Sequence, residues 1–157
     1  MIKKTNAVRE LEQHKIPYTT KEYEVDENDL SAIHVALVTN TDLERIFKTL
    51  SLLNEKNELI IACIPGGDNI DLKKLAKTAG CKKVEMLPLK ELTKYTGYIR
   101  GGCSPVGIRK KHESFIHSSA LNFDSILISG GMRGVQIEIN PKNLIEYLKM
   151  KVGDIIV

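Results

Sequence analysis

Two apolar segments in the first half of the chain have the patterns of β-strands. Residues 45–53 alternate well enough for a strand, and residues 59–64 form an unbroken apolar run, as in strands buried on both faces. The polar residues 54–57 between them predict a hairpin turn. Further strands are predicted at residues 18–25, 82–86, 115–116, 125–129 and 135–139, with a second hairpin turn at 130–134.

Apolar residues at helical spacing, preceded by capping residues, predict five short helices. They are expected to start at Thr5 or Asn6, Ser31, Asp71, Pro88 and the pair Asn140-Pro141, and glycines at 80 and 97 are expected to end the third and fourth. Their apolar positions are Val8 and Leu11; Ile33, Ala36 and Leu37; Leu72, Leu75, Ala76 and Ala79; Leu89 and Leu92; and Leu144, Ile145 and Leu148. Those of the first, third and fourth helices are predicted to face inward.

This order of elements predicts an α+β fold around a curved, largely antiparallel sheet. The strands and helices do not alternate as in a regular βαβ series, and the chain has no Walker-type or dinucleotide-binding glycine motif. Its 157 residues suit a single domain spanning residues 1–157.

Composition narrows the function classes only slightly. An apolar fraction of 42% supports a proper core, and a net charge of +3 permits a polyanionic partner without requiring one. The three cysteines form no CxxC pair, which argues against a disulfide framework and a structural zinc site and fits a reducing cytoplasm. We expect no signal peptide and no membrane span, because apolar runs of the necessary length are absent from the sequence.

A lysine interrupts the apolar row of the strand at residues 45–53. Counting in steps of two places Lys48 on the same face as Ile46, Leu50 and Leu52. An isolated ammonium buried there would cost several kcal/mol, so it must pair, reach water or lose its proton. Lys48 is therefore either a strand-end residue that extends to solvent or a cation lining a pocket for a phosphate, carboxyl or ester oxygen.

The segment 96–107 contains four glycines and a proline. Glycine permits positive φ angles and close approach of another molecule, and Pro105 favours an extended conformation at Ser104. The segment is either a tight connection between strands or a stiff loop that holds a polar ligand through its backbone groups.

Several kinds of catalytic site are disfavoured by the sequence. The four histidines lack metal-ligand spacing, and no GxSxG motif is present. Cys103 lies in the glycine-rich loop, but the sequence places no histidine to activate it as a nucleophile. The basic run at residues 109–112 is either a solvated turn or a contact for phosphates.

Five motifs, in this order, resemble the YbaK/EbsC family, the freestanding relatives of the editing domain of bacterial prolyl-tRNA synthetase. They occupy residues 47–50, 71–76, 82–86, 96–107 and 129–134. The resemblance implies a mixed, barrel-like sheet surrounded by helices and an aminoacyl-tRNA deacylase that clears Cys-tRNA(Pro). It also implies that the thiol of the substrate attacks the ester, so that neither a covalent enzyme intermediate nor a metal or other cofactor is needed.

The same resemblance assigns the site residues. Lys48 matches the family's functional lysine and is the predicted catalytic residue. The predicted substrate-binding residues are Tyr23, Thr49, Tyr98, Gly101, Gly102, Cys103, Ser104, Pro105 and Ser129. Apart from the resemblance, the positive charges in and next to the glycine-rich loop predict secondary contacts to the tRNA backbone by Arg100, Arg109, Lys110 and Lys111.

Two departures from the family pattern keep alternatives open. Gln136 stands where some relatives carry an acid, and residues 28–33 lack the phenylalanine of close relatives, which weakens cysteine relative to alanine as the substrate. The alternatives are a deacylase of Ala-tRNA(Pro) or another small aminoacyl-tRNA, and a non-catalytic module that binds a nucleotide or a protein. Partners would be tRNA and, on the editing hypothesis, prolyl-tRNA synthetase.

Overall fold

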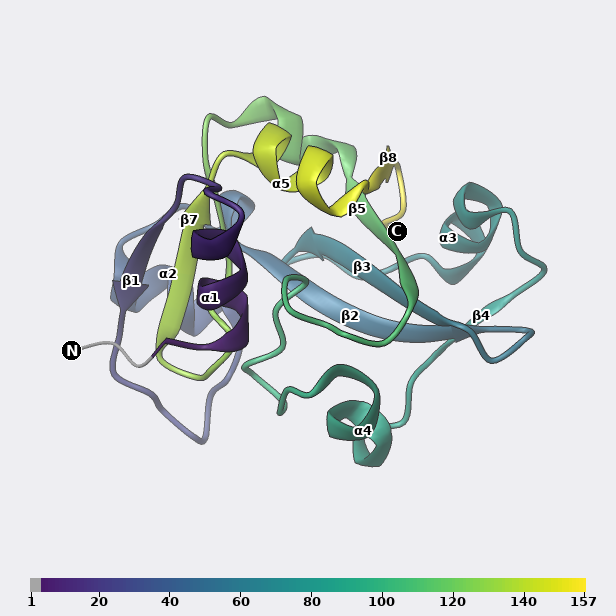
Figure 1. Ribbon diagram of the computed structural model, residues 1–157, viewed down its shortest axis with the longest axis horizontal. Coiled ribbons are helices and arrows are strands. Elements are labelled where there is room, and N and C mark those ends of the chain that lie inside the picture. Colours follow the sequence, from purple (N-terminus) through teal and green to yellow (C-terminus); the bar gives the residue numbers. More distant parts are fainter. Residues whose placement is uncertain (1–3) are drawn as a thin grey trace.

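The fold consists of two β-sheets with helices around them, as the computed structural model in Figure 1 shows; it describes residues 4–157. The larger sheet has the strand order β4-β2-β3-β5-β8 and the smaller has the order β1-β7-β6. The expected α+β class and the mixed, mostly antiparallel pairing are confirmed, since among the paired strands of residues 4–157 only β3–β5 and β5–β8 are parallel.

The larger sheet is built on the predicted hairpin. Its strands are β2 (Phe47–Asn54), β3 (Leu59–Pro65), β4 (Val84–Met86), β5 (His112–His117) and β8 (Lys151–Gly153). Every residue of β3 is buried, as its unbroken apolar run predicted. The β2 strand begins at Phe47 instead of Arg45, because Leu43–Arg45 forms the 3-10 turn η1.

The smaller sheet comprises β1 (Thr19–Glu22), β6 (Ile126–Ser129) and β7 (Val135–Ile139). The β6–β7 hairpin closes through the predicted glycine-rich turn. A single bridge between Ile46 and Leu127 connects this sheet to the start of β2. The expectation of a barrel-like sheet is thus unconfirmed: the strands found in residues 4–157 form two open sheets and no closed barrel.

The helices are α1 (Asn6–Gln13), α2 (Ala32–Thr39), α3 (Leu72–Ala79), α4 (Leu92–Thr96) and α5 (Pro141–Leu148), with the short turns η2 (Leu89–Glu91) and η3 (Ser118–Asn122). Thr5, Ser31, Asp71 and Asn140 each accept a backbone N–H hydrogen bond as N-caps, which confirms these starts. None of the helices in the described part of the chain is long and apolar enough to cross a membrane.

Two predicted inward positions are wrong. Leu72 is 38% exposed because it lies in the first turn of α3, and the buried positions of that helix are Leu75 and Ala76. Leu89 is 59% exposed because it lies in η2, a 3-10 turn, where the spacing of an α-helical face does not apply.

Two hydrophobic clusters carry the fold. One joins α1, α5 and the smaller sheet to Phe47, Cys63 and Ile116 of the larger sheet. The other packs α3 against the larger sheet through Leu75 and Phe115, among other residues. Because the first cluster fixes the sheets against each other, side chains at their junction have defined positions.

Candidate functional site

The candidate site lies at the junction of the two sheets. Along one edge of β2, strand β4 pairs only with Leu52–Asn54, and the bridge to β6 forms at Ile46. Between them, Lys48 to Leu50 pair with β3 alone. A cavity of about 400 Å³ lies at this edge, lined by Tyr23, Leu30, Ala32, Val35, Ile46, Phe47, Lys48, Thr49, Leu50, Arg100, Gly101, Cys103, Ser129 and Gln136.

Lys48 is half-buried and lines this cavity. No carboxylate among residues 4–157 lies within ion-pair distance of its ammonium. The cavity also contains no aspartate or glutamate. The sequence left two roles open for Lys48, a strand-end residue that extends to solvent or a cation that lines a pocket. Its position in the structure agrees with the second role.

Opposite β2, the glycine-rich loop borders the cavity through Arg100, Gly101 and Cys103. Gly101 has φ = +83°, in the region that favours glycine. A Cβ atom at Gly102 would lie 3.0 Å from the Cα of Met132, so a side chain there would press on the backbone of the β6–β7 turn, on which this loop packs. Arg133 Nε donates a 2.8 Å hydrogen bond to the Arg100 carbonyl oxygen and ties the two segments together.

Other predicted binding residues support the loop from behind and do not line the cavity. The buried Tyr98 hydroxyl donates a 2.5 Å hydrogen bond to the carbonyl oxygen of Val106, and Ser104 Oγ accepts one of 3.2 Å from the Val106 N–H. Pro105 and Gly102 are buried beside them. Their geometry fixes the loop conformation, whereas Tyr23, Thr49 and Ser129 reach the cavity wall.

The protonation of Cys103 bears on whether the protein supplies a nucleophile. Burial raises the pKa of this thiol, and the nearby Thr96 and Ser51 hydroxyls oppose the shift only in part. Reactive cysteines show the opposite shift, toward a lower pKa. At neutral pH Cys103 is therefore a thiol and not a thiolate.

Gln136 is the main residue of the cavity wall to which the sequence assigned no role. Gln136 is only 5% exposed and lines the cavity. Within the part of the chain that the structure describes, its carboxamide makes no hydrogen bond to another protein group. The sequence showed only that residue 136 is polar. That Gln136 lies directly opposite Ser129 becomes visible only in the pairing of β6 with β7.

The wall contributed by α2 and by Leu30, two residues before this helix, is apolar. Leu30, Ala32 and Val35 line this side of the cavity. A small aliphatic or thiol side chain of a ligand could pack there, while polar groups face Lys48, Ser129 and Gln136 on the other sides.

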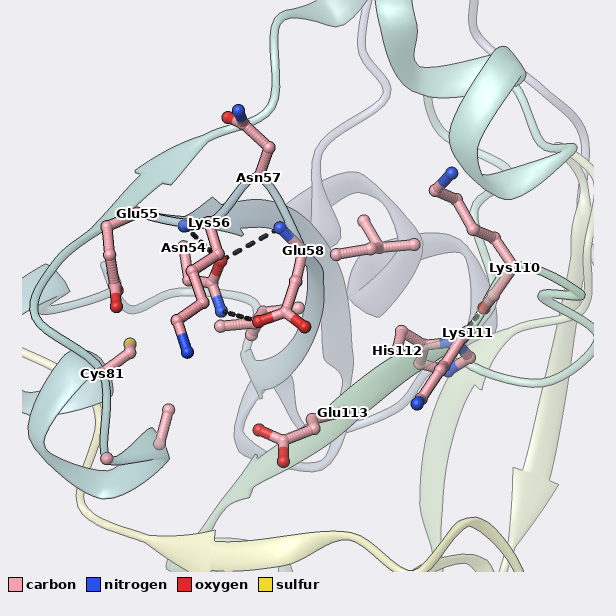
Figure 2. Close-up of a pocket in the computed structure, with 14 residues that line it drawn as sticks. Asn54, Glu55, Lys56, Asn57, Glu58, Cys81, Lys110, Lys111, His112 and Glu113 are labelled. Atoms are coloured by element: carbon pink, nitrogen blue, oxygen red, sulfur yellow. Dashed lines mark hydrogen bonds between the residues drawn. The ribbon is translucent and has the colours of Figure 1, made fainter.

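A second, larger cavity of about 520 Å³ lies elsewhere on the molecule, between the β2–β3 turn, the end of α3 and the start of β5 (Figure 2). Lys110 and Lys111 line it, so they lie apart from the Lys48 cavity, and Arg109 lines neither. Its charged side chains, apart from the half-buried Glu55, are exposed. We assign the chemistry to the smaller cavity, because that cavity combines a half-buried cation, exposed backbone groups and the carboxamide of Gln136 on its wall.

No metal-binding centre is evident from the side chains: nowhere in residues 4–157 do three or more histidine, cysteine, aspartate or glutamate side chains gather in a group that could hold an ion.

Sequence comparison assigns the chain to a protein family. Residues 27–147 match the model of the aminoacyl-tRNA editing domain, and the chain is a member of that family. The match includes Lys48, the glycine-rich loop and Gln136, and it agrees with the resemblance that the sequence motifs indicated.

Three individual proteins are similar to the chain in sequence. The chain is 45% identical over 152 residues to the Enterococcus faecalis protein named "Putative Cys-tRNA(Pro)/Cys-tRNA(Cys) deacylase EbsC", covering 97% of this chain and 93% of that protein. It is 33% identical to the Bacillus subtilis protein YwhH, covering 84% of this chain and 85% of that one. It is also 27% identical to a segment of the proline–tRNA ligase of Brachyspira hyodysenteriae, covering 87% of this chain and 24% of the ligase.

Solved structures share the fold. The crystal structure of a hypothetical protein superposes with a TM-score of 0.89 at 19% identity, covering 97% of this chain and 99% of the other. A second, described as "a putative trans-editing enzyme for prolyl tRNA synthetase", superposes with a TM-score of 0.83 at 20% identity, covering 97% and 95% of the two chains.

Proposed function

We propose that this chain is a deacylase that cleaves cysteine from mischarged Cys-tRNA(Pro). The observation that carries the proposal is the Lys48 ammonium, which has no carboxylate partner in the described chain and lies in one cavity with the exposed backbone of Gly101. The similarity to EbsC supports cysteine as the amino acid. The volume of about 400 Å³ lies within the usual range of small-ligand sites.

In this mechanism the substrate supplies its own nucleophile. The cysteinyl sulfur attacks the ester carbonyl, the S–C bond forms, the bond from the carbonyl carbon to the 3′ oxygen breaks, and the thiol proton passes to that oxygen. The thiolactone released is then opened by water. This route requires no thiolate on the enzyme, consistent with the raised pKa of Cys103.

Lys48 stabilises the negative charge that develops on the ester oxygens during the attack, and its partial burial strengthens that interaction. Gly101 and its neighbours offer backbone groups that orient the amino acid. Gln136 and Ser129 provide uncharged hydrogen-bonding groups on the wall formed by the smaller sheet. Arg100 stands at the cavity wall as a cation for the 3′-terminal phosphates.

The test is deacylation of Cys-tRNA(Pro) by the wild type, by Lys48→Ala and by Lys142→Ala, an exposed lysine on α5 that serves as a matched control. Loss of one group that stabilises the transition state slows catalysis by about 10²–10³-fold. We expect this loss for Lys48→Ala with unchanged thermal unfolding, and none for Lys142→Ala. Equal rates for the wild type and Lys48→Ala would exclude the role of Lys48.

A second candidate substrate is Ala-tRNA(Pro), which the apolar wall of Leu30, Ala32 and Val35 would also accommodate. Alanine has no thiol, so water must attack the ester. Parallel assays of both charged tRNAs separate the two substrates. Binding without turnover of any aminoacyl-tRNA would instead favour a non-catalytic module.

The proposal places the protein in the cytoplasm, with aminoacylated tRNA as its substrate and prolyl-tRNA synthetase as a partner. The similarity to a segment of a proline–tRNA ligase supports this pairing. Adding the synthetase to the deacylation assay should raise discrimination between tRNA(Pro) and other cysteinylated tRNAs.

A further inference from the structure

Helix α2 carries apolar side chains on both its inner and its outer face. On the inner face, Val35 is buried in one core cluster with Leu127 of β6, and α2 lies on the opposite side of the smaller sheet from α1 (Figure 1). The outer face of α2 consists of Ile33, Leu37 and Val38, which are 56%, 76% and 47% exposed. A helix that is apolar all round is normally buried, so the exposure of this face requires an explanation.

The exposed side chains of α2 form a group. Single exposed apolar residues are common on protein surfaces, whereas contiguous ones mark interaction sites. Leu37 lies one helical turn beyond Ile33, and Val38 follows Leu37 directly. The helix contains no charged residue that could cover these side chains or interrupt the group.

The segments on either side of α2 are acidic. Residues 22–44 contain seven carboxylates and neither lysine nor arginine, although the whole chain has a net charge of +3. All seven are exposed, namely Glu22, Glu24, Asp26, Glu27, Asp29, Asp42 and Glu44. None of them forms an ion pair within residues 4–157, and the two cations that border the segment, Lys21 and Arg45, both contact Glu138 instead. The apolar face therefore has an acidic rim with no cations of its own.

This combination of charges disfavours several occupants of the outer face. Nucleic acids and the surfaces of anionic membranes would be repelled by the carboxylates. A symmetric pair of copies would place the same patch on both sides of the interface, so that the two acidic rims would meet and repel each other. A protein surface with an apolar centre and a basic rim is complementary to both features.

We infer that the outer face of α2 is a docking surface for another protein, whose contact surface has an apolar centre surrounded by lysine or arginine residues. Ile33 and Leu37 supply the central apolar contacts, and the carboxylates on both sides of α2 orient the partner and speed its association. Ala32 and Val35 of the same helix line the Lys48 cavity, so the partner would sit on one wall of that cavity. The inference stands without the proposed function, because neither tRNA nor catalysis enters into it.

The test uses two amphipathic helical peptides as probes for the partner surface. One has leucines along one face and lysines on the other faces, and the second has glutamates in place of the lysines. Fluorescence anisotropy at several salt concentrations measures the binding of each peptide to the full chain. We expect the wild type to bind the lysine peptide at least about tenfold more tightly than the glutamate peptide, and the difference should shrink as salt screens the charges.

The apolar contribution is tested by combining Ile33→Ala with Leu37→Ala. Alanine favours the helix, and both positions are exposed, so the fold should be retained, as thermal unfolding can verify. Binding of the lysine peptide should weaken by at least about tenfold. Leu89→Ala, at another exposed leucine outside α2, is the matched control and should leave binding unchanged.

The acidic rim is tested by combining Glu27→Gln with Glu44→Gln. This variant should bind the lysine peptide about threefold more weakly and with a smaller salt dependence. Glu146→Gln, at an exposed glutamate on α5, is the matched control and should change neither quantity.

Four results would overturn the inference. The first is no detectable binding of the lysine peptide to the wild type, and the second is equal binding of the two peptides. The third is equal affinity of the wild type and the Ile33→Ala, Leu37→Ala variant, because the peptide would then bind elsewhere. The fourth is self-association of the wild type in sedimentation experiments, or binding to anionic vesicles, that this variant abolishes, since the outer face would then belong to a second copy or to a membrane.

Discussion

Ser129 and Gln136 are directly opposite each other in the β6–β7 hairpin, and both side chains line the cavity that contains Lys48. Ser129 Oγ accepts a hydrogen bond of 3.2 Å from the Gly131 N–H in the turn, whereas the Gln136 carboxamide makes none within residues 4–157. The Ser129 hydroxyl thus already accepts one hydrogen bond within its own turn. The glutamine presents donors and an acceptor that a ligand can satisfy.

Replacing Gln136 by leucine should separate ligand recognition from stability. The Gln136 carboxamide faces the cavity and makes no hydrogen bond within residues 4–157, so Gln136→Leu should leave the free energy of unfolding nearly unchanged. Turnover of Cys-tRNA(Pro) should fall by about tenfold, because the ligand loses a hydrogen bond. Denaturant unfolding and single-turnover deacylation measure the two effects. The control is Gln13→Leu at the exposed end of α1, and a Gln136→Leu protein as active as the wild type would contradict the assignment.

Tyr98→Phe removes the hydroxyl that donates to the Val106 carbonyl. Both groups are buried, so the free energy of unfolding should fall by about 1–2 kcal/mol. Deacylation should weaken too, since the hydrogen bond fixes the glycine-rich loop. Tyr95→Phe, which alters a half-buried tyrosine on α4, is the matched control and should be nearly neutral. Full stability in Tyr98→Phe would show that the loop is held by other contacts.

The cysteine thiols should react slowly in the folded protein. Burial raises the pKa of Cys103, and burial raises that of Cys63 to about 12. Alkylation by iodoacetamide at pH 7.5, followed by peptide mass spectrometry, should be at least about tenfold slower at both sites than in urea. If Cys103 reacts as fast in the folded as in the unfolded protein, it has thiolate character and becomes a candidate nucleophile again.

Glu138 should make the free energy of unfolding depend on pH in the acid range. The hydroxyl of Ser125 and the guanidinium of Arg45, 2.7 and 2.8 Å from its carboxylate, lower the pKa of Glu138 in the folded state. A lowered folded-state pKa contributes stability above the unfolded value of about 4.3, and this contribution is lost as the pH falls through the folded value.

Glu138→Gln should therefore be less stable than the wild type by about 1 kcal/mol at pH 7, and the difference should shrink toward pH 3. Urea unfolding across this pH range measures it. Glu85→Gln is the control, because the exposed pair of Glu85 with Lys83 should contribute little. A constant difference between wild type and Glu138→Gln at every pH would contradict the electrostatic origin.

Patterns of neighbouring residues in the sequence were sufficient to predict most of the helices and strands. Thr5, Ser31, Asp71 and Asn140 cap helices as predicted, since a cap depends on residues within one turn. The two hairpins follow from their turn residues, and Lys48 stood out as a charge in an apolar row. The family motifs then identified the class of function.

Tertiary structure alone decided what depends on contacts between distant segments. The pairing of β5 with β8, the division into two sheets and the burial of Gln136 arise from neighbours far away in sequence, which no local pattern encodes. The same packing turned Tyr98 and Ser104 toward the loop interior and placed Lys110 and Lys111 in a separate cleft. Residue identities thus determined which groups are present, and the packing of the two sheets determined which of them share a cavity.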